Sequence, residues 1–285
     1  MQKPICLITG ATEGIGRATA TELAGLGFTV VLAARNAAKA EAVKNEIAAS
    51  TGNRDVDIIA ADLRSLAQVR QLSETFHRRY PRLDVLINNA GIFSAERQLT
   101  EDGFEATFQV NYLTPFYLTH LMLDALKQSD QGRVVNLSSS VYSVGKFDPH
   151  NPQGKKPFST FSAYANSKLL ILLHTIELAS RLKDTPVTVN AVHPGVVRTQ
   201  MMFRATGIFR VVAYLALPFA HSPQEGAATS AHLAVSPDLR TVSGKYFTQR
   251  KETNVKTTFN TESNRKLLWD LSMKSLRLDE GSAAI

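Results

Sequence analysis

Short apolar runs alternate with longer amphipathic segments along most of the chain. The runs are ICLIT, TVVLAA, VDIIAA, DVLIN, RVVNLSS and VTVNAV, and a stretch long enough for a helix separates each from the next. Strands that alternate with helices in this way form βαβ units, in which the strands are parallel and helices cover both faces of the sheet. The pattern therefore predicts an α/β fold with a doubly wound parallel sheet.

This rhythm continues without a break that would mark a second domain. Before residue 200, no stretch rich in proline, glycine and serine divides the chain, so we expect a single domain over residues 1–285. Two segments depart from the rhythm, the polar insertion GKFDPHNPQGKKPFSTF at residues 145–161 and a segment at about residues 200–221. Loops that follow the carboxyl ends of parallel strands form the ligand site of such folds, so both segments are expected to flank it.

The second of these segments contains the sequence MMFRATGIFRVVAYLALPFA, at residues 201–220. It is too apolar for an ordinary exposed loop, but Arg204, Arg210 and Pro218 interrupt it, and its longest apolar run is about half of the ~20 residues that a bilayer span needs. We expect a substrate lid of one or two mobile helices at about residues 200–221. The alternative is a helix packed in the core under the last strand.

Charge narrows the classes of partner. The chain has 285 residues and a formal net charge of +7. The segment from Arg240 to Arg277 contains nine Lys and Arg residues but only three Asp and Glu residues. A basic region of this kind is most often a solvated surface, although it also suits peripheral contact with an anionic membrane. No nucleic-acid recognition motif accompanies it, so we expect no nucleic-acid partner. The sequence leaves homo-oligomerisation open.

Cysteine and histidine usage points to a reducing compartment and to metal-free chemistry. The only cysteine, Cys6, lies in the apolar run PICLIT, so no intrachain disulfide can form. No basic segment followed by a long apolar core opens the chain, and we expect a cytoplasmic protein, with membrane contact at most peripheral. The seven histidines show no paired metal spacing, and we expect no metal site.

A glycine-rich turn follows the first predicted strand. The sequence TGATEGIGRATATELA places Gly10, Gly14 and Gly16 between that strand and a helix. Glycines at such a turn allow the backbone to approach a phosphate closely, and the helix N-terminus supplies free N–H groups and a positive dipole. The turn thus predicts dinucleotide binding in a Rossmann-type domain.

The residues at the end of the second predicted strand indicate which dinucleotide the protein binds. An NAD-binding Rossmann protein usually carries an acidic residue there for the ribose 2′-hydroxyl, whereas this chain has Ala34 followed by Arg35. The Arg35 guanidinium suits a 2′-phosphate, and Lys39 offers a second contact, so NADP(H) is favoured over NAD(H). A solvated arginine is the alternative for Arg35, and Glu13 in the glycine turn argues against a nearby phosphate.

A tyrosine and a lysine stand four residues apart in the segment SAYANSKLLILLHTIEL. Residues with this spacing share one face of a helix, so the Tyr164 phenol and the Lys168 ammonium could act on one bound molecule. The spacing alone occurs by chance in many proteins, and one turn of a buried helix is an equally valid interpretation of the pair by itself.

Taken together, the motifs resemble those of the short-chain dehydrogenase/reductase family, and in particular its retinol-dehydrogenase-like branch. The resemblance covers nearly the whole length, and the long gap between Ser139 and Tyr164 is typical of this branch. The matching motifs, in chain order, are TGATEGIG, DL at Asp62 and Leu63, NNAG at residues 88–91, QVNYL with Asn111, VVNLSSS, YANSK and HPGVVRT.

The resemblance implies four catalytic residues. Tyr164 would be the general acid/base, Lys168 would lower the Tyr164 pKa and bind the nicotinamide ribose, Ser139 would hold the carbonyl oxygen, and Asn111 would support a proton relay. A phenol needs a pKa shift of about two to three units to exchange a proton near neutrality, which a cation ~4 Å away can supply at an effective dielectric of ~20. Alternatively, Ser138 or Ser140 takes the serine role, or Asn111 is only structural.

The resemblance also implies a set of cofactor-binding residues. They lie in the glycine turn, after the second, third and fourth predicted strands, on the tyrosine-bearing helix and in the HPGVVRT turn. The set is Gly10, Thr12, Gly14, Ile15, Gly16, Arg35, Asp62, Leu63, Asn89, Ala90, Gly91, Tyr164, Lys168, Pro194, Gly195, Val197 and Thr199.

The function expected from the sequence is hydride transfer between NADP(H) and a lipophilic carbonyl or alcohol, such as an aldehyde, a ketone or a retinoid- or steroid-like compound. The alternative is a non-catalytic NADP(H)-binding module that reports redox state to a protein partner. Such a module is expected to lack Ser139, Tyr164 or Lys168. The sequence retains all three and therefore favours the enzyme.

Overall fold

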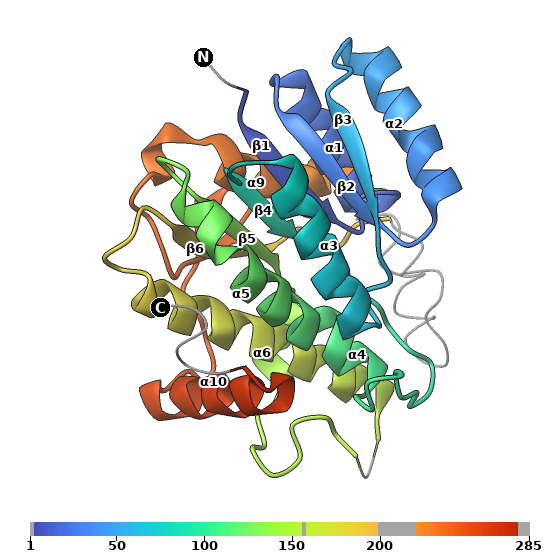
Figure 1. Cartoon of the computed structure of the whole chain (residues 1–285). Helices are drawn as coiled ribbons and strands as arrows, with labels where there is room; N and C mark the ends of the chain where they lie inside the picture. The colour runs from blue at the N-terminus through green and yellow to red at the C-terminus, as the bar shows by residue number, and fades with distance from the viewer. Residues whose placement is uncertain (1–2, 156–157, 199–219, 279–285) are drawn as a thin grey trace.

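One eight-stranded sheet organises the protein (Figure 1). The computed structural model describes residues 3–155, 158–198 and 220–278. Thr199 and nearly all of the predicted lid segment lie outside the described residues. The strands are β1 (Ile5–Thr9), β2 (Thr29–Ala34), β3 (Val56–Ala60), β4 (Val85–Asn88), β5 (Arg133–Leu137), β6 (Thr188–His193), β7 (Tyr246–Thr248) and β8 (Lys251–Glu252).

The strand order is β3-β2-β1-β4-β5-β6-β7-β8, and every neighbouring pair is parallel except β7 and β8. The six apolar runs coincide with β1 to β6, so the predicted doubly wound parallel sheet is confirmed. The pattern did not predict β7 and β8. β8 has two exposed residues, too few to show an alternation of apolar and polar positions.

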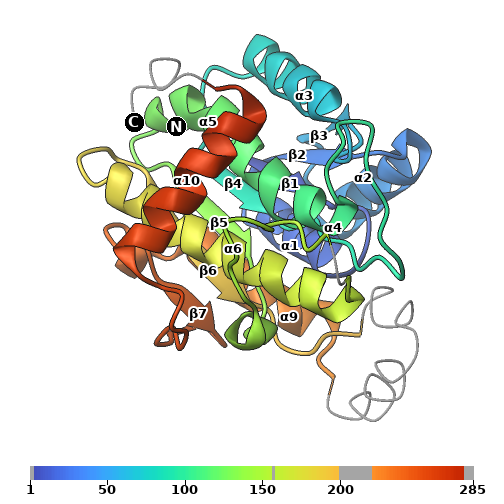
Figure 2. The same cartoon turned by 90° about the horizontal axis from the view of Figure 1, so that it is seen from below.

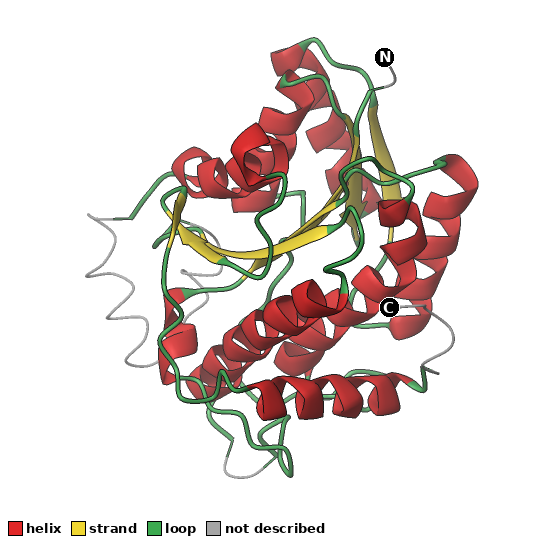
Figure 3. Ribbon diagram, turned by 90° about the vertical axis from the view of Figure 1, so that its left-hand side faces the viewer, coloured by secondary structure: helices red, strands yellow, loops and turns green. Residues whose placement is uncertain are grey.

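Helices cover both faces of the sheet (Figure 3). One face packs against α1 (Gly14–Gly25), α2 (Ala37–Thr51) and α9 (Pro223–Val235). The other face carries α6 (Thr160–Arg181), and α10 (Glu262–Leu276) packs against the outer side of α6 (Figure 2). This second layer also contains α3 (Leu66–Arg79) and α5 (Thr114–Lys127). Short helical turns lie between the longer elements, namely α4 (Ala106–Phe108), η1 (Gln109–Leu113), η2 (Ser140–Val144) and η4 (Pro237–Leu239). Within the described ranges, no helix is long and apolar enough to cross a bilayer.

The strand order places a topological switch between β1 and β4. The chain moves outward from β1 through β2 to β3, and then returns to the other side of β1 as β4. The turns that leave β1 and β4 therefore meet at the carboxyl edge of the sheet, where open α/β sheets bind their ligands. The contact is close, since a Cβ on Gly10 would lie 2.9 Å from the Ala90 Cα.

Helix α6 carries the tyrosine and lysine motif and begins at a clear sequence signal. The side chain of its N-cap residue, Ser159, accepts a hydrogen bond from the Ser162 N–H, which satisfies one of the free donors of the first turn. From Ala165 onward most of the helix is buried, because it lies between the sheet and α10. A helix buried on two sides has apolar residues over most of its surface, which agrees with the run LLILL at residues 169–173 of α6.

A buried histidine in α6 lies among aromatic rings. The His174 ring stacks on Trp269 at 5.9 Å and lies 4.8 Å from the Phe116 ring, and within the described part of the chain neither of its nitrogens has a hydrogen-bond partner. Burial and, to a lesser extent, the charge of His120 together lower the pKa of His174 to about 3. The fold therefore holds this imidazole in its neutral form.

The pKa shift of His174 predicts a pH-dependent loss of stability. Because the folded-state pKa is below the ordinary value of about 6.5, protonation of the unfolded chain alone costs the fold about 1.4 kcal/mol per pH unit as the pH falls from 6.5 toward 3. We expect the unfolding free energy of His174→Leu, measured by urea titration, to fall less steeply with acidification than that of the unaltered protein. Parallel pH curves for the two proteins would contradict this account.

Candidate active site

Tyr164, Ser139 and Lys168 meet at the carboxyl ends of the central strands. Tyr164 and Lys168 are one turn apart on α6, and the Lys168 Nζ lies 5.5 Å from the centre of the Tyr164 ring. Ser139 follows β5 by two residues, and its side chain is close enough to the Tyr164 phenol to lower the pKa of that phenol. The structure thus brings together three of the residues that the sequence selected for catalysis.

The three consecutive serines after β5 have different environments. The Ser138 hydroxyl is buried and donates a hydrogen bond to the Lys168 carbonyl at 2.8 Å, so it holds α6 against the end of the strand. Ser140 is exposed and begins η2. Of the three serines, only Ser139 affects the pKa of the Tyr164 phenol. Geometry therefore favours Ser139 over its neighbours for contact with a molecule bound at Tyr164.

Lys168 is almost fully buried. Its Nζ donates a hydrogen bond to the Leu137 carbonyl at 2.8 Å, and the ammonium group has two further donors available for a ligand. Burial lowers the pKa of Lys168 to about 8, since the low-dielectric surroundings disfavour the charged form. The lysine remains mostly protonated at neutral pH and becomes neutral as the pH rises past 8.

The pKa of Tyr164 moves in the direction opposite to the one expected from the sequence. Burial raises the pKa to about 12, while the hydrogen bond from Ser139 opposes part of that rise. The sequence argument considered the attraction of Lys168 alone and placed its charge ~4 Å away. In the structure desolvation of the phenol sets the direction of the shift, and Lys168 is not among its causes.

Asn111 lies in a π-helical turn, η1, which joins α4 to α5. Such turns reorient side chains and are frequent at functional sites. The Asn111 carboxamide accepts a hydrogen bond from the Ile92 N–H at 2.7 Å and donates to the Ile92 carbonyl at 3.0 Å and to the Ser167 hydroxyl at 3.1 Å. Ser167 in turn donates to the Tyr164 carbonyl at 2.7 Å. Asn111 therefore links the loop after β4 to the tyrosine-bearing turn of α6.

The glycine turn has the form required by a phosphate group. A Cβ on Gly16 would lie 2.3 Å from the Gly10 carbonyl oxygen, and Gly10 and Gly14 adopt φ values of +65° and +54°, so larger residues do not fit these positions. No side chain caps the N-terminus of α1, and its first N–H groups remain available to an anion. Thr12 and Ile15 complete the turn.

Hydrogen bonds connect the turn after β4 to the glycine turn after β1. The Asn89 side chain donates to the Thr9 and Gly10 carbonyls at 2.8 and 3.1 Å, and the Thr9 hydroxyl accepts from the N–H groups of Asn89 and Ala90 at 3.0 Å each. Gly91 continues this turn toward Ile92. These bonds fix both turns relative to each other before any ligand binds.

The carboxyl ends of β2 and β3 form the far end of the candidate dinucleotide site. Arg35 is exposed and has no ion-pair or hydrogen-bond partner within the described ranges. Lys39 and Glu13 form an ion pair with each other at 2.6 Å, so the carboxylate that argued against a phosphate already has a cation beside it. Asp62 follows β3 and accepts from the Arg64 N–H at 2.9 Å, and Leu63 accepts from the Thr114 hydroxyl through its carbonyl at 2.8 Å.

The turn after β6 contains Pro194, Gly195 and Val197. Gly195 has a φ of +87°, and a Cβ there would lie 2.8 Å from the His221 ring. The His221 N–H donates to the Val196 carbonyl at 2.8 Å. This bond brings the chain at His221 back to the turn after β6. A Cβ on Gly226 of α9 would lie 2.6 Å from Val197 and 3.3 Å from Ile15, which shows that this turn and the glycine turn approach the same point.

Three contacts at the site escaped the sequence interpretation. The Phe93 ring packs edge-on against Tyr164 at 5.5 Å, Ser167 links Asn111 to α6, and Thr9 holds the turn after β4. Thr9 and Ser167 carry a usable signal, because they lie within the motifs TGATEGIG and YANSK. Phe93 carries no such signal, since its partner is remote in the sequence.

The described residues contain no cluster of side chains suited to a metal ion. In residues 3–155, 158–198 and 220–278, no group of three or more His, Cys, Asp and Glu side chains is arranged to hold a metal ion. Cys6 is fully buried in β1, and burial raises the pKa of its thiol. The polar groups at the carboxyl edge are instead hydroxyls, amides and cations, which suit a phosphorylated organic ligand.

Comparison with known proteins agrees with this geometry. The family model for short chain dehydrogenases matches residues 4–206. Retinol dehydrogenase 12 of Mus musculus is 42% identical over 272 residues, which cover 95% of this chain and 86% of that protein. Retinol dehydrogenase 11 of Homo sapiens is 40% identical over 274 residues, which cover 96% and 86% respectively.

Solved structures show the same fold. A protein from Mycobacterium paratuberculosis superposes with a TM-score of 0.77 at 29% identity, over 97% of this chain and 94% of its own. A short chain dehydrogenase from Escherichia coli, complexed with NADPH, superposes with a TM-score of 0.70 at 29% identity, over 88% and 98%. The sequence match, the sheet order and the placement of the motifs together show that the chain belongs to the short-chain dehydrogenase/reductase family, in its retinol-dehydrogenase-like branch.

Proposed function

We propose that the protein transfers a hydride between NADP(H) and a lipophilic carbonyl or alcohol. The observation that carries this proposal is the meeting of Tyr164, Ser139 and Lys168 after β5, where the Lys168 Nζ lies 5.5 Å from the centre of the Tyr164 ring and the Ser139 side chain lowers the pKa of the phenol. A hydroxyl pair of this kind can hold a carbonyl oxygen and give it a proton. The rigid glycine turn nearby fits the pyrophosphate of a dinucleotide.

In the reducing direction, the chain's own residues provide the proton and the orientation. The carbonyl oxygen of the substrate accepts hydrogen bonds from Ser139 and Tyr164, and the Tyr164 proton moves to that oxygen as it gains negative charge. The bound cofactor supplies the hydride that adds to the carbonyl carbon. Lys168 steadies the resulting phenolate, and the Asn111 and Ser167 contacts keep this turn of α6 in place.

The raised pKa of Tyr164 keeps the phenol at neutral pH in the protonated form that carbonyl reduction uses. A phenol whose pKa is about 12 keeps its proton at neutral pH and is ready to act as an acid. Alcohol oxidation needs the phenolate as a base, which is scarce at that pH. The supporting observation for this direction is the burial of the phenol, with Phe93 packed against the ring.

The preference for NADP(H) rests on the cations at the end of β2. Arg35 is free to bind a 2′-phosphate, and the Glu13 carboxylate is neutralised by Lys39 at 2.6 Å. The family uses NAD(P), and two structural relatives, a short chain dehydrogenase from Shigella flexneri and one from Escherichia coli, are complexed with NADP and NADPH respectively. These observations support the phosphorylated form of the cofactor for this chain.

A lipophilic substrate is proposed from the relatives and from the sequence. Several curated relatives are named retinol dehydrogenases, and the apolar segment at residues 200–221 would cover such a ligand as a lid. A cytoplasmic protein that touches membranes peripherally would have access to compounds of this kind. We also propose that residues 1–285 form a single domain.

The direct test is a substrate screen. Purified protein is mixed with NADPH and with aldehydes, ketones, retinoids or steroids, and the absorbance of the reduced nicotinamide is followed. The proposal expects loss of absorbance with at least one lipophilic carbonyl and faster loss with longer apolar substrates. Binding of NADPH without turnover on any member of the panel would favour a non-catalytic module instead.

Tyr164→Phe removes the transferable proton with little change in volume. General acid/base groups contribute ~10²–10⁴-fold to rate, so we expect turnover on a carbonyl to fall by that factor while the dissociation constant of NADPH stays nearly unchanged. Tyr80→Phe is a matched control, because Tyr80 bonds to Asp57 beyond the C-terminus of α3 and its loss should spare turnover. Near-normal turnover by Tyr164→Phe would remove Tyr164 from the proposed role.

Arg35→Asp replaces the proposed 2′-phosphate contact with a repelling charge. Loss of one charge-assisted bidentate contact costs ~1.5–3 kcal/mol, so NADPH affinity should fall by about one to two decades and the preference over NADH should vanish or reverse. Dissociation constants for both cofactors, from nicotinamide fluorescence, provide the measurement. Arg54→Asp makes the same change of charge at an exposed position before β3 and should leave the ratio unchanged. Equal binding of NADPH and NADH by the unaltered protein would show that Arg35 does not select the cofactor.

A further inference from the structure

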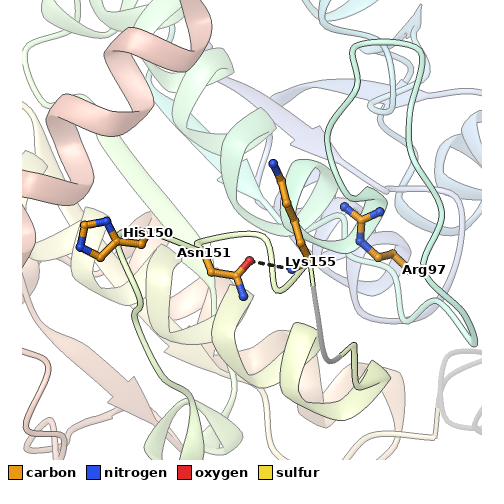
Figure 4. A pocket seen from close by; sticks show the side chains of 4 residues that line it. All are labelled: Arg97, His150, Asn151 and Lys155. Carbon is orange, nitrogen blue, oxygen red and sulfur yellow. Dashed lines mark hydrogen bonds between the residues drawn. The ribbon is translucent and has the colours of Figure 1, made fainter.

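A basic hollow lies between the loop after β4 and the polar insertion before α6 (Figure 4). Its volume is about 430 Å³, and its lining residues are Arg97, His150, Asn151 and Lys155. In the close view, the Arg97 and Lys155 side chains extend beside each other, while the His150 ring lies toward the other end. All four side chains can donate hydrogen bonds and none is acidic.

Both walls of the hollow are held by hydrogen bonds. The Gln153 carboxamide oxygen accepts from the Glu105 N–H at 2.9 Å, and this bond ties the insertion to the opposite loop. Within the insertion, the Lys155 N–H donates to the Asn151 side-chain oxygen at 2.7 Å (Figure 4). These bonds fix the two segments that carry the donors of the hollow.

The two cations of the hollow, Arg97 and Lys155, have no carboxylate partner within the described ranges. Among those residues, the Arg97 Nε is buried without a hydrogen-bond partner. The nearby carboxylates are engaged elsewhere. Both Glu105 oxygens accept from N–H groups of α4 at 2.9 and 2.7 Å, and Asp148 accepts from the His150 N–H at 2.9 Å.

The loop after β4 contributes to both the hollow and the candidate active site. The Phe93 ring packs against Tyr164, and two residues further along the same loop the Ala95 carbonyl accepts from the Thr160 hydroxyl at 3.0 Å. Thr160 begins α6, about 6 Å along the helix axis from Tyr164, and Arg97 is at most about 7 Å of chain beyond Ala95. The hollow is therefore within roughly 20 Å of the phenol, a distance that a long apolar molecule can span.

We propose that this hollow binds an acidic end group of the substrate, a carboxylate or a phosphate, while the carbonyl at the other end of an apolar body reaches Tyr164. An arginine fork with a lysine and an amide beside it matches the geometry of an oxyanion. This inference rests on the proposed hydride transfer at Tyr164 and narrows its substrate class to amphipathic carbonyl compounds with one acidic terminus.

The test compares long-chain ω-oxo acids with their methyl esters in a series of increasing length. The two members of a pair differ in one charge and keep the same reacting aldehyde. For the unaltered protein, kcat/KM with NADPH should be higher for the acid than for the ester, with the largest ratio at the length that bridges the two sites. Arg97→Gln and Lys155→Gln should each lower kcat/KM for the acid by about one to two decades, mainly through KM, and leave the ester unchanged.

Lys146→Gln provides the matched control. Lys146 is an exposed lysine of the same insertion, its backbone N–H bonds to Asn166 at 2.8 Å, and its side chain does not line the hollow. Its substitution changes the net charge equally and should leave the ratio of acid to ester unchanged. Undiminished ester turnover and an unchanged melting temperature show that each variant is folded.

Three results would overturn the hollow as a substrate site. The first is an equal kcat/KM for acid and ester in the unaltered protein, and the second is a parallel loss for both in Arg97→Gln. In either case, turnover of the ester by the unaltered protein would leave the proposed activity at Tyr164 intact. The third is an acid-to-ester ratio of one together with Arg97-dependent binding to vesicles of anionic phospholipid, which would assign the hollow to lipid head groups.

A binding measurement keeps the inference testable if no aldehyde is turned over. Calorimetric titration of the NADPH-bound protein with an unreactive long-chain fatty acid should give a dissociation constant about ten- to a hundredfold higher for Arg97→Gln than for the unaltered protein. The methyl ester should show no such difference. Equal constants for the acid in both proteins would overturn the inference without reference to catalysis.

Discussion

The junction between α6 and the end of β5 determines the geometry of the candidate site. Lys168 contributes to it twice, because its ammonium donates to the Leu137 carbonyl and its own carbonyl accepts from Ser138, each at 2.8 Å. With the helix fixed at this point, Tyr164 falls one turn earlier on the same face, and Ser139 follows directly after the anchoring serine. The positions of the three proposed catalytic groups thus depend on one pair of buried hydrogen bonds.

Burial at this junction also controls the charges. Desolvation raises the Tyr164 pKa and lowers the Lys168 pKa, so both groups are shifted toward their neutral forms. A neutral phenol is a proton donor, and a lysine whose pKa is about 8 still provides a positive charge at neutral pH. The same dense packing that positions the groups therefore suits them to reduction of a carbonyl, and the basic hollow beyond Phe93 adds a means of choosing which carbonyl compound binds.

The fold and the main motifs could be predicted because their signals are local. The apolar runs of β1 to β6, the glycines after β1 and the tyrosine and lysine spacing on α6 can each be recognised within a few neighbouring residues. Features set by distant segments could not be predicted in the same way. The sign of the Tyr164 pKa shift depends on burial by the whole fold, the Glu13–Lys39 pair joins α1 to α2, and the hollow requires Arg97 to lie opposite an insertion more than fifty residues later.

The central claim is hydride transfer at Tyr164, and isotope transfer tests it most directly. NADPH carrying deuterium at the reactive position of the nicotinamide is incubated with the protein and a lipophilic aldehyde, and the alcohol product is examined by mass spectrometry. The account predicts an alcohol that contains one deuterium, bound to the former carbonyl carbon, in an amount equal to the NADPH consumed. An alcohol without deuterium, or consumption of NADPH without alcohol, would contradict it.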